Sequence, residues 1–241
     1  MTGRRLFNMT RETRGSVSPE ISVDQLEKMR RDWDDRAREN ARYYVATGRK
    51  DWTDEQFFAS GEKAVSEDVL TDMTNICQER DPLAMRVLEI GCGAGRVTRA
   101  LSKIFGEVHA VDVSGEMVAR AREALRDRPN VHLYQNNGCD LAVVPPLEFD
   151  FAYSTIVFQH IPSYDVIDNY MREVNRLLRP GALFKFQVQG YQGARSRPDD
   201  TWHGVPYSEE RARAMALRTG FEMRYTYGVG SQYFWLWFFK Q

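Results

Sequence analysis

A glycine-rich segment at residues 86–95 carries the residue types of a cofactor-binding loop. It reads RVLEIGCGAG, an apolar run that ends in an acid and then places glycine at alternate positions. Glycine reaches positive φ and lets the backbone approach a ligand, because it has no Cβ. A segment with helical periodicity follows, so a strand, a loop and a helix are predicted. The loop residues predicted to bind the cofactor are Glu89, Gly91, Cys92, Gly93 and Gly95.

The glycine spacing separates two cofactor classes. The dinucleotide fingerprint is G-x-G-x-x-G/A, whose third small residue lets the helix pack close to the strand. Here that position holds Arg96, a long cation. A carboxylate at Glu89 would repel a pyrophosphate, whereas it would attract an ammonium group. The spacing therefore favours a nucleoside that carries positive charge over NAD or FAD.

These residues resemble the first motif of the class I S-adenosylmethionine-dependent methyltransferases, an acid, one residue and then G-x-G-x-G. Further weak matches follow in the family's order, and their order makes the inference strong. They run from about residue 86 to the C-terminus. The resemblance implies S-adenosyl-L-methionine as cofactor and S-adenosyl-L-homocysteine as product.

The resemblance also implies further cofactor contacts at the ends of the next strands. Asp112 ends a second buried strand, where the family hydrogen-bonds both ribose hydroxyls, and Val113 and Met117 fall where it packs the adenine. Asn137 and the backbone of Gly138 correspond to the adenine-edge loop. Taken alone, Asp112 and Asn137 would be ordinary strand-end or turn residues.

Ser154 ends the fourth strand of the family pattern and is expected to face the same crevice. Parallel sheets bind ligands beyond the carboxyl ends of their strands, where the strand order reverses. The four predicted strand ends should therefore meet at one cavity.

His160 is the candidate catalytic residue, because the segment 157–162 resembles the family's H-[IL]-P/D element beside the methyl group. An imidazole with a pKa near ~6.5 can accept a proton at neutral pH. A histidine that only orders this turn is an equal alternative. His109 and His132 are interpreted as structural residues within strands, and His203 as a surface or packing residue.

The chemistry implied by a sulfonium cofactor is in-line displacement on an oxygen or nitrogen nucleophile. Well-oriented proximity contributes roughly 7–11 kcal/mol to such a step, so no covalent enzyme intermediate is required. The expected acceptor is a small, partly apolar molecule such as a specialised metabolite, sugar or lipid. The alternatives are a protein or peptide methyltransferase and a non-catalytic cofactor-binding regulatory protein. An NAD-linked oxidoreductase is disfavoured by Glu89 and Arg96.

Nucleic-acid bases are poor candidates for the acceptor. The family's base and amide methyltransferases carry an Asp/Asn-Pro-Pro-aromatic motif after the fourth strand, whereas residues 154–157 read STIV. Cytosine C5 chemistry needs a nucleophilic cysteine there, and no cysteine follows Cys139. The formal net charge of -1 gives no basic field that would attract a polyanion.

Aromatic side chains are candidates for the wall of an apolar acceptor site or for the core of an N-terminal cap. For Trp33 the core interpretation is favoured. The candidates are Trp33, Tyr43, Tyr44, Phe57, Phe58, Tyr191, Trp202 and Tyr207.

The three cysteines, Cys77, Cys92 and Cys139, have no metal-ligand spacing, so no bound metal is expected. We expect them to be reduced thiols in a cytoplasmic protein. No apolar run is long enough to span a bilayer. The oligomeric state is left open.

Strand and helix patterns alternate from Arg86 onward, which predicts an α/β fold with a mostly parallel sheet covered on both faces. The resemblance implies a Rossmann-like, doubly wound, seven-stranded sheet of order 3-2-1-4-5-7-6 with an antiparallel last strand. Residues 1–80 are predicted to form a helical cap or lid, and residues 81–241 the cofactor-binding domain.

Overall fold

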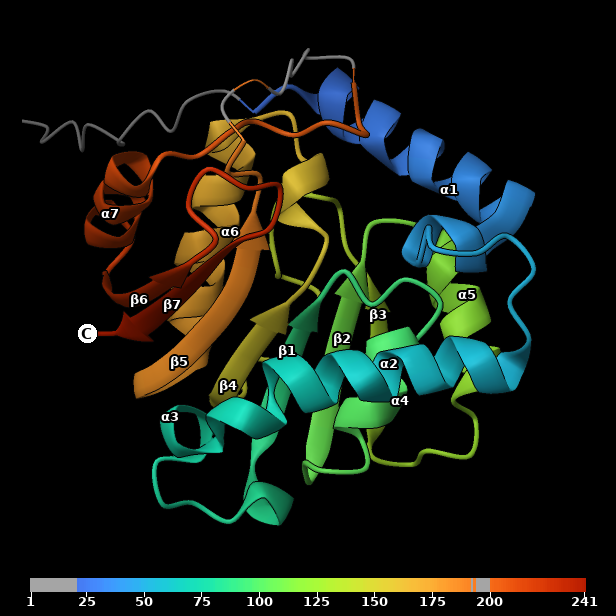
Figure 1. Cartoon of the computed structure of the whole chain (residues 1–241), viewed down its shortest axis with the longest axis horizontal. Helices are drawn as coiled ribbons and strands as arrows, with labels where there is room; N and C mark the ends of the chain where they lie inside the picture. Colours follow the sequence, from blue (N-terminus) through green and yellow to red (C-terminus); the bar gives the residue numbers. More distant parts are fainter. Residues whose placement is uncertain (1–20, 192, 194–199) are drawn as a thin grey trace, which may run out of the picture.

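A seven-stranded sheet forms the centre of the computed structural model, which describes residues 21–191, 193 and 200–241 (Figure 1). Its strand order is β3-β2-β1-β4-β5-β7-β6, and β7 runs antiparallel to both neighbours. The predicted fold class and strand order are therefore confirmed. The strands are β1 (Arg86–Ile90), β2 (Glu107–Asp112), β3 (Val131–Gln135), β4 (Phe149–Ser154), β5 (Leu178–Val188), β6 (Phe221–Tyr227) and β7 (Phe234–Lys240).

Helices begin where the sequence places capping residues. Thr53 and Gln56 form a complete capping box at the start of α2, and the Ser208 side chain accepts a hydrogen bond from the backbone of Arg211 at the start of α7. The helices are α1 (Val23–Val45), α2 (Asp54–Asp68), α3 (Met73–Cys77), α4 (Arg96–Leu101), α5 (Gly115–Ala124), α6 (Tyr164–Leu177) and α7 (Glu209–Arg218). No described helix is long and apolar enough to cross a membrane.

Both faces of the sheet are buried, because successive side chains of a strand point to opposite faces. Leu88 of β1 packs in the core that includes α6, whereas Val87 packs in the core that includes α2 and α4. Figure 1 shows α2 and α4 over one face and α6 over the other. Val65 of α2 and Ile76 of α3 share the second core with β1, so this part of the predicted cap packs directly on the sheet.

The connection between β3 and β4, residues 136–148, contains no helix. Parallel strands are usually joined by a crossover helix that covers the sheet. Here Leu141 and Val144 are the buried apolar residues of the connection. These two residues pack in the same core as Val111 of β2 and the inner side of α6.

The first helix roofs the carboxyl ends of the strands (Figure 1). It is kinked at Asn40, whose φ is -165° and ψ is 84°, and it continues beyond the kink to Val45. Arg38 on α1 pairs with Glu116 at the start of α5. The roof is therefore anchored to the helix that follows β2.

Candidate functional site

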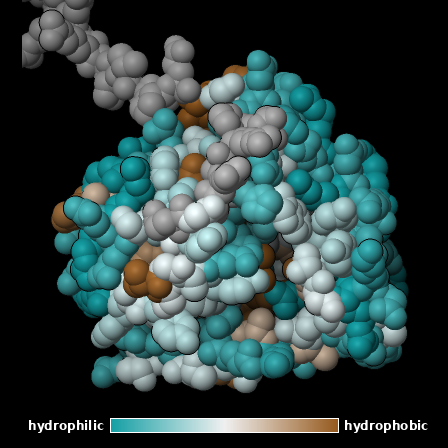
Figure 2. Space-filling model, turned by 45° about the horizontal axis from the view of Figure 1, so that its top comes forward, coloured by the Kyte–Doolittle hydropathy of each residue, from teal (hydrophilic) through white to brown (hydrophobic). Residues whose placement is uncertain are grey.

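A cavity lies between α1 and the carboxyl ends of β1, β2 and β4, where the topology predicted a ligand site. Figure 2 brings this edge forward and shows a hollow with apolar walls. Four side chains of α1 line the cavity, and the glycine loop and the segment after β4 supply most of the rest. The contributions of α1 are Met29, Trp33, Tyr44 and Val45.

The glycine loop forms one wall of this cavity. Gly91 and Gly93 line it with φ values of 78° and 51°. A Cβ at Gly91 would come within 2.1 Å of Val157 Cγ2, and one at Gly93 within 2.6 Å of Val45 Cγ2. Cys92 also lines the cavity, and burial raises the pKa of its thiol, which stays protonated. Glycine is thus required here by close packing against cavity walls as well as by positive φ.

Two residues predicted to touch the cofactor lie away from the cavity. Gly95 has a φ of 83°, and its missing Cβ makes room for Leu125 Cδ1 at 2.9 Å. Met117 is buried among Ala37, Phe57 and other residues of the interface between α1 and α5. In this structure Gly95 lets α4 pack near α5 and Met117 packs beneath α1, and their contact with the cofactor stays a prediction.

Two carboxylates line the cavity at neighbouring strand ends. Asp112 accepts hydrogen bonds from the backbone of Gly93 at 2.8 Å and of Ser114 at 2.9 Å, and burial raises its pKa to about 6. Burial also raises the pKa of Glu89 to about 7, and the charge of Asp112 adds to this effect. Glu89 Oε2 is buried without a hydrogen-bond partner among the described residues. Two buried carboxylates are costly to ionise, and a cationic ligand would stabilise their charged forms. The site is therefore suited to bind a cation.

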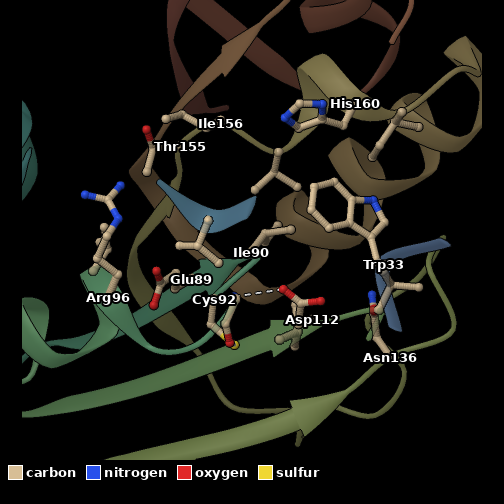
Figure 3. Close-up of a pocket in the computed structure, with 18 of the residues that line it drawn as sticks. Trp33, Glu89, Ile90, Cys92, Arg96, Asp112, Asn136, Thr155, Ile156 and His160 are labelled. Carbon is tan, nitrogen blue, oxygen red and sulfur yellow. Dashed lines mark hydrogen bonds between the residues drawn. The ribbon is translucent and has the colours of Figure 1, made fainter. Parts of the chain in front are cut away.

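Arg96 also lines the cavity, although its sequence position served only to exclude a dinucleotide. It is 8% exposed, its Nη1 donates to the Ser60 carbonyl at 3.1 Å, and its Nε has no partner among the described residues. Figure 3 places Glu89 and Arg96 side by side at one end of the cavity, with Asp112 toward the other. The position of Arg96 directly after the glycine loop was the sequence signal that could have predicted its place in the cavity wall.

In the predicted adenine-edge loop, the residue that lines the cavity is Asn136. Asn137 is exposed, and its Oδ1 accepts the N–H groups of Cys139 at 3.0 Å and Asp140 at 2.9 Å in a local turn. Asn136 lines the cavity instead, and its Nδ2 donates to the Tyr170 hydroxyl at 2.7 Å. The Asn137 side chain closes its own turn and does not line the cavity, so its contact with the adenine stays a prediction.

Gly138 and Ser154 also lie outside the cavity lining. A Cβ at Gly138 would come within 2.8 Å of Met29 Cε and 3.0 Å of Val113 Cγ2, so α1 and Val113 cover it. Val113 itself lines the cavity as predicted. The Ser154 hydroxyl is buried and donates to the Ile90 carbonyl at 2.9 Å, which ties β4 to β1. Residues 155–157 take the place expected for Ser154.

His160 lies on the wall of the cavity that faces the glycine loop (Figure 3). Its Nδ1 is 2.6 Å from the Trp202 carbonyl, an acceptor, so Nδ1 carries the proton and Nε2 carries the lone pair. Burial lowers the pKa of His160 to about 4. Its ring packs between Trp33 and Trp202, with centroid distances of 5.3 and 4.9 Å. The imidazole is therefore neutral and oriented, and its Nε2, which lies 3.4 Å from the Gln159 amide nitrogen, is the atom that can accept a hydrogen bond or a proton.

A second, outer cavity joins the first at Tyr44, Val45, Ile156 and His160, which line both. Among the described residues that line the outer cavity there is no Asp, Glu, Lys or Arg. Its described lining consists of amides, hydroxyls, aromatic and imidazole rings and aliphatic side chains. This arrangement can hold an uncharged, partly planar molecule beside His160.

The aromatic candidates divide between these walls and the core. Trp33 packs against the core, the favoured interpretation, and also lines the inner cavity. Tyr191 and Trp202 line the outer cavity, and Tyr44 lines both. The others, Tyr43, Phe57, Phe58 and Tyr207, line neither cavity, and Phe57 and Tyr207 are fully buried.

The family model that matches this chain is described as a methyltransferase domain and covers residues 87–181. A ubiquinone biosynthesis O-methyltransferase of Xanthomonas campestris pv. campestris (strain B100) is 30% identical over 148 residues, which are 56% of this chain and 61% of that protein. A malonyl-[acyl-carrier protein] O-methyltransferase of Enterobacter lignolyticus is 33% identical over 103 residues, which are 42% of this chain and 38% of that protein. The matched part of the chain thus spans less than two thirds of the length of each of these curated relatives.

Solved structures share the fold over most of the chain. The DhpI–SAH complex has a TM-score of 0.63 and 20% identity, and the match covers 90% of this chain and 98% of that one. Magnesium protoporphyrin IX methyltransferase (ChlM) from Synechocystis PCC 6803 with bound SAM has a TM-score of 0.62 and 16% identity, covering 92% and 100%. At these identities the likeness establishes the overall architecture alone.

Proposed function

We propose that this chain, which carries a methyltransferase domain of the class I S-adenosylmethionine-dependent type, transfers a methyl group to an oxygen of a small, uncharged acceptor. The choice of oxygen is supported by the O-methyltransferases among its curated relatives, two of which are described above. The choice of acceptor is supported by the outer cavity, whose described lining holds no Asp, Glu, Lys or Arg and which meets the inner cavity at His160. That junction is the single observation on which the proposal rests.

The inner cavity fits S-adenosyl-L-methionine by the chemistry of its unpaired groups. Glu89 Oε2 and Arg96 Nε are both buried without partners among the described residues, which suits the ammonium and carboxylate of an amino-acid moiety. Asp112 would accept the ribose hydroxyls, and Val113 and Asn136 would contact the adenine. When bound, this cofactor supplies an electrophilic methyl group on a sulfonium.

His160 suits a reaction beside a positive charge. A protonated imidazole would repel a sulfonium, whereas burial keeps His160 neutral. The Trp202 carbonyl fixes Nδ1 as the protonated nitrogen, so Nε2 can accept the proton that an acceptor hydroxyl loses. Trp33 and Tyr44 close the cavity from the roof and help to exclude water.

Competing functions receive less support from the same features. A protein or peptide acceptor would require an open groove, whereas α1 covers the inner cavity. A purely regulatory cofactor-binding protein would not need acceptor space, whereas the outer cavity adjoins the inner one at four shared residues.

Cofactor binding is tested by calorimetry with S-adenosyl-L-homocysteine and with methylthioadenosine, which lacks the amino-acid moiety. We expect the full ligand to bind more tightly to the wild-type chain, and Arg96→Met and Glu89→Gln to reduce that difference. Equal binding of the two ligands by the wild-type chain would contradict the assignment of Glu89 and Arg96.

Methyl transfer is tested with methyl-labelled cofactor and a panel of neutral phenols, carboxylates, amines and peptides. We expect label in the phenols and not in the peptides. Label in peptides alone would support the protein-methylating alternative, and cofactor binding without any labelled product would support the non-catalytic one.

A further inference from the structure

Three metal-ligating side chains converge on the sheet at the end opposite the cofactor cavity. Glu107 and His109 are two residues apart on β2 and so point to the same face. His132 on β3 pairs in register with His109. Within the described part of the chain, this is the one group of three His, Cys, Asp or Glu side chains close enough to share an ion. We propose that Glu107, His109 and His132 bind a divalent transition-metal ion, with Zn²⁺ as the best-fitting candidate.

The distances suit a single shared ion. His109 Nε2 lies 3.1 Å and His132 Nε2 lies 3.0 Å from the same atom, Glu107 Oε1. Zinc binds imidazole nitrogen and carboxylate oxygen at about 2.0–2.2 Å, so two ligands of one tetrahedral ion are roughly 3.3 Å apart. The two distances to Glu107 Oε1 are therefore within a few tenths of an ångström of the tetrahedral value, and all three donor atoms lie within 4.8 Å of one another.

The state of His109 is an independent indication of a ligand. Its ring is 2% exposed, and its Nε2 has no hydrogen-bond partner of acceptable geometry among the described residues. Its Nδ1 lies 3.0 Å from the Tyr134 hydroxyl. Metal-binding histidines characteristically donate their second ring N–H to such an outer partner, which points the Nε2 lone pair at the ion.

The carboxylate is held in a matching orientation. Arg86 Nε donates to Glu107 Oε2 at 2.6 Å, which leaves Oε1 for the two imidazoles. The side chains of Glu107 and His132 are 31% and 41% exposed, so an ion can enter from solvent.

The ligand set selects the class of ion. Two imidazoles and one carboxylate favour zinc and its neighbours over Mg²⁺ or Ca²⁺, which prefer oxygen ligands. Glu107 begins β2 and Asp112 ends it, and a strand rises about 3.3 Å per residue, so the sites are roughly 17 Å apart. The ion would fasten the edge strand β3 to β2 and take no part in methyl transfer.

Titration of the tag-free full chain with ZnCl₂ and CoCl₂, after dialysis against EDTA, tests the site. We expect one ion per chain by calorimetry, a visible Co²⁺ absorption band typical of tetrahedral coordination, and a higher Tm with Zn²⁺. His132→Ala should weaken binding by more than about tenfold, and Tyr134→Phe by about tenfold through loss of the outer partner. His132 is preferred to His109 for this test because its exposed ring makes folding of the variant secure.

His203→Ala is the matched control, because His203 is an exposed histidine beside a carboxylate, Asp200, elsewhere on the chain. It should bind Zn²⁺ as the wild type does. No binding by the wild type, wild-type affinity in His132→Ala, or an equal loss in His203→Ala would overturn the proposal. Unchanged affinity in Tyr134→Phe would remove His109 from the ligand set and overturn the three-residue site.

Discussion

The Asp34 carboxylate in α1 accepts a hydrogen bond of 2.7 Å from the Ser114 hydroxyl, which lies 80 residues later in the sequence. The same oxygen accepts the N–H of Glu116 at 3.2 Å. Ser114 caps α5, and its own N–H donates to Asp112. The roof of the cofactor cavity is thereby joined to the strand end that carries the proposed ribose ligand.

Asp34→Ala should destabilise the chain and weaken cofactor binding. The substitution leaves the buried Ser114 hydroxyl and the Glu116 N–H without their acceptor, which costs about 1–3 kcal/mol. A loosened α1 would also hold Trp33 less firmly over the cavity. Urea unfolding gives the loss of stability, and calorimetry with S-adenosyl-L-homocysteine gives the loss of affinity.

Asp35→Ala is the matched control for Asp34→Ala. Its side chain is 75% exposed and pairs with Arg38 on the surface. Exposed substitutions of this kind change stability by within about 0.5 kcal/mol. Similar losses in the two variants would mean that the Asp34 contacts do not anchor the roof.

The fold followed from the sequence because its signals are local. Alternating strand and helix patterns, the glycine loop and the capping residues Thr53 and Ser208 each depend on a few neighbouring residues. The resemblance then supplied the strand order, which no local pattern contains. The cofactor-cavity residues on β1 and β2, Glu89 and Asp112, were predictable for the same reason.

The rest of the site depends on contacts between distant segments. The choice of Asn136 over Asn137 is made by a local turn that occupies the Asn137 side chain. Trp33 becomes a cavity wall only because α1 crosses the strand ends. The approach of His109 to His132 requires the register of β2 against β3, which the sequence does not reveal.

Cofactor affinity should increase as the pH rises from about 5.5 to about 8. Burial raises the pKa of Glu89 to about 7 and of Asp112 to about 6, against ordinary values near ~4. Between these limits the folded chain binds more protons than the unfolded chain, so these two groups make the ligand-free chain less stable as pH rises. A cationic ligand favours their ionised forms, and its effect on Tm should grow over the same interval.

Calorimetry of cofactor binding across this pH range, for the wild type and for Glu89→Gln, checks whether these two carboxylates are ionised when the ligand binds. In Glu89→Gln the affinity should no longer change with pH near 7, where Glu89 titrates. It should still change near pH 6, where Asp112 titrates. An affinity of the wild type that does not change with pH would show that neither carboxylate is ionised by the ligand.

Gln187→Leu should lower both stability and turnover. Ile156 has a φ of 58°, a costly conformation for a β-branched residue, and its N–H donates to Gln187 Oε1 at 2.9 Å. Loss of this acceptor costs about 1–3 kcal/mol and lets Ile156 relax at the junction of the two cavities. Thermal unfolding and steady-state kinetics measure the two effects.

Thr155→Val provides the comparison for Gln187→Leu. It removes only the longer bond of 3.3 Å between Thr155 Oγ1 and Gln187 Oε1. It should therefore cost less stability and preserve the conformation of Ile156. A larger loss of stability in Thr155→Val than in Gln187→Leu would show that the Gln187 side chain is not what holds Ile156 at positive φ.

Substitutions of His160 separate a base from a residue that only orders its turn. In His160→Asn the side-chain N–H can replace Nδ1–H as donor to the Trp202 carbonyl, but no basic nitrogen remains at Nε2. If Nε2 accepts the proton, kcat should fall by about 10²–10⁴ while the affinity for S-adenosyl-L-homocysteine stays close to that of the wild type. Because burial lowers the pKa of His160 to about 4, wild-type turnover limited by this group should be lost only as the pH falls toward that value, well below the ~6.5 of a free histidine. Wild-type kcat in His160→Asn, combined with a loss in His160→Ala, would show that the Trp202 contact is the function of this residue and that the acceptor is deprotonated elsewhere.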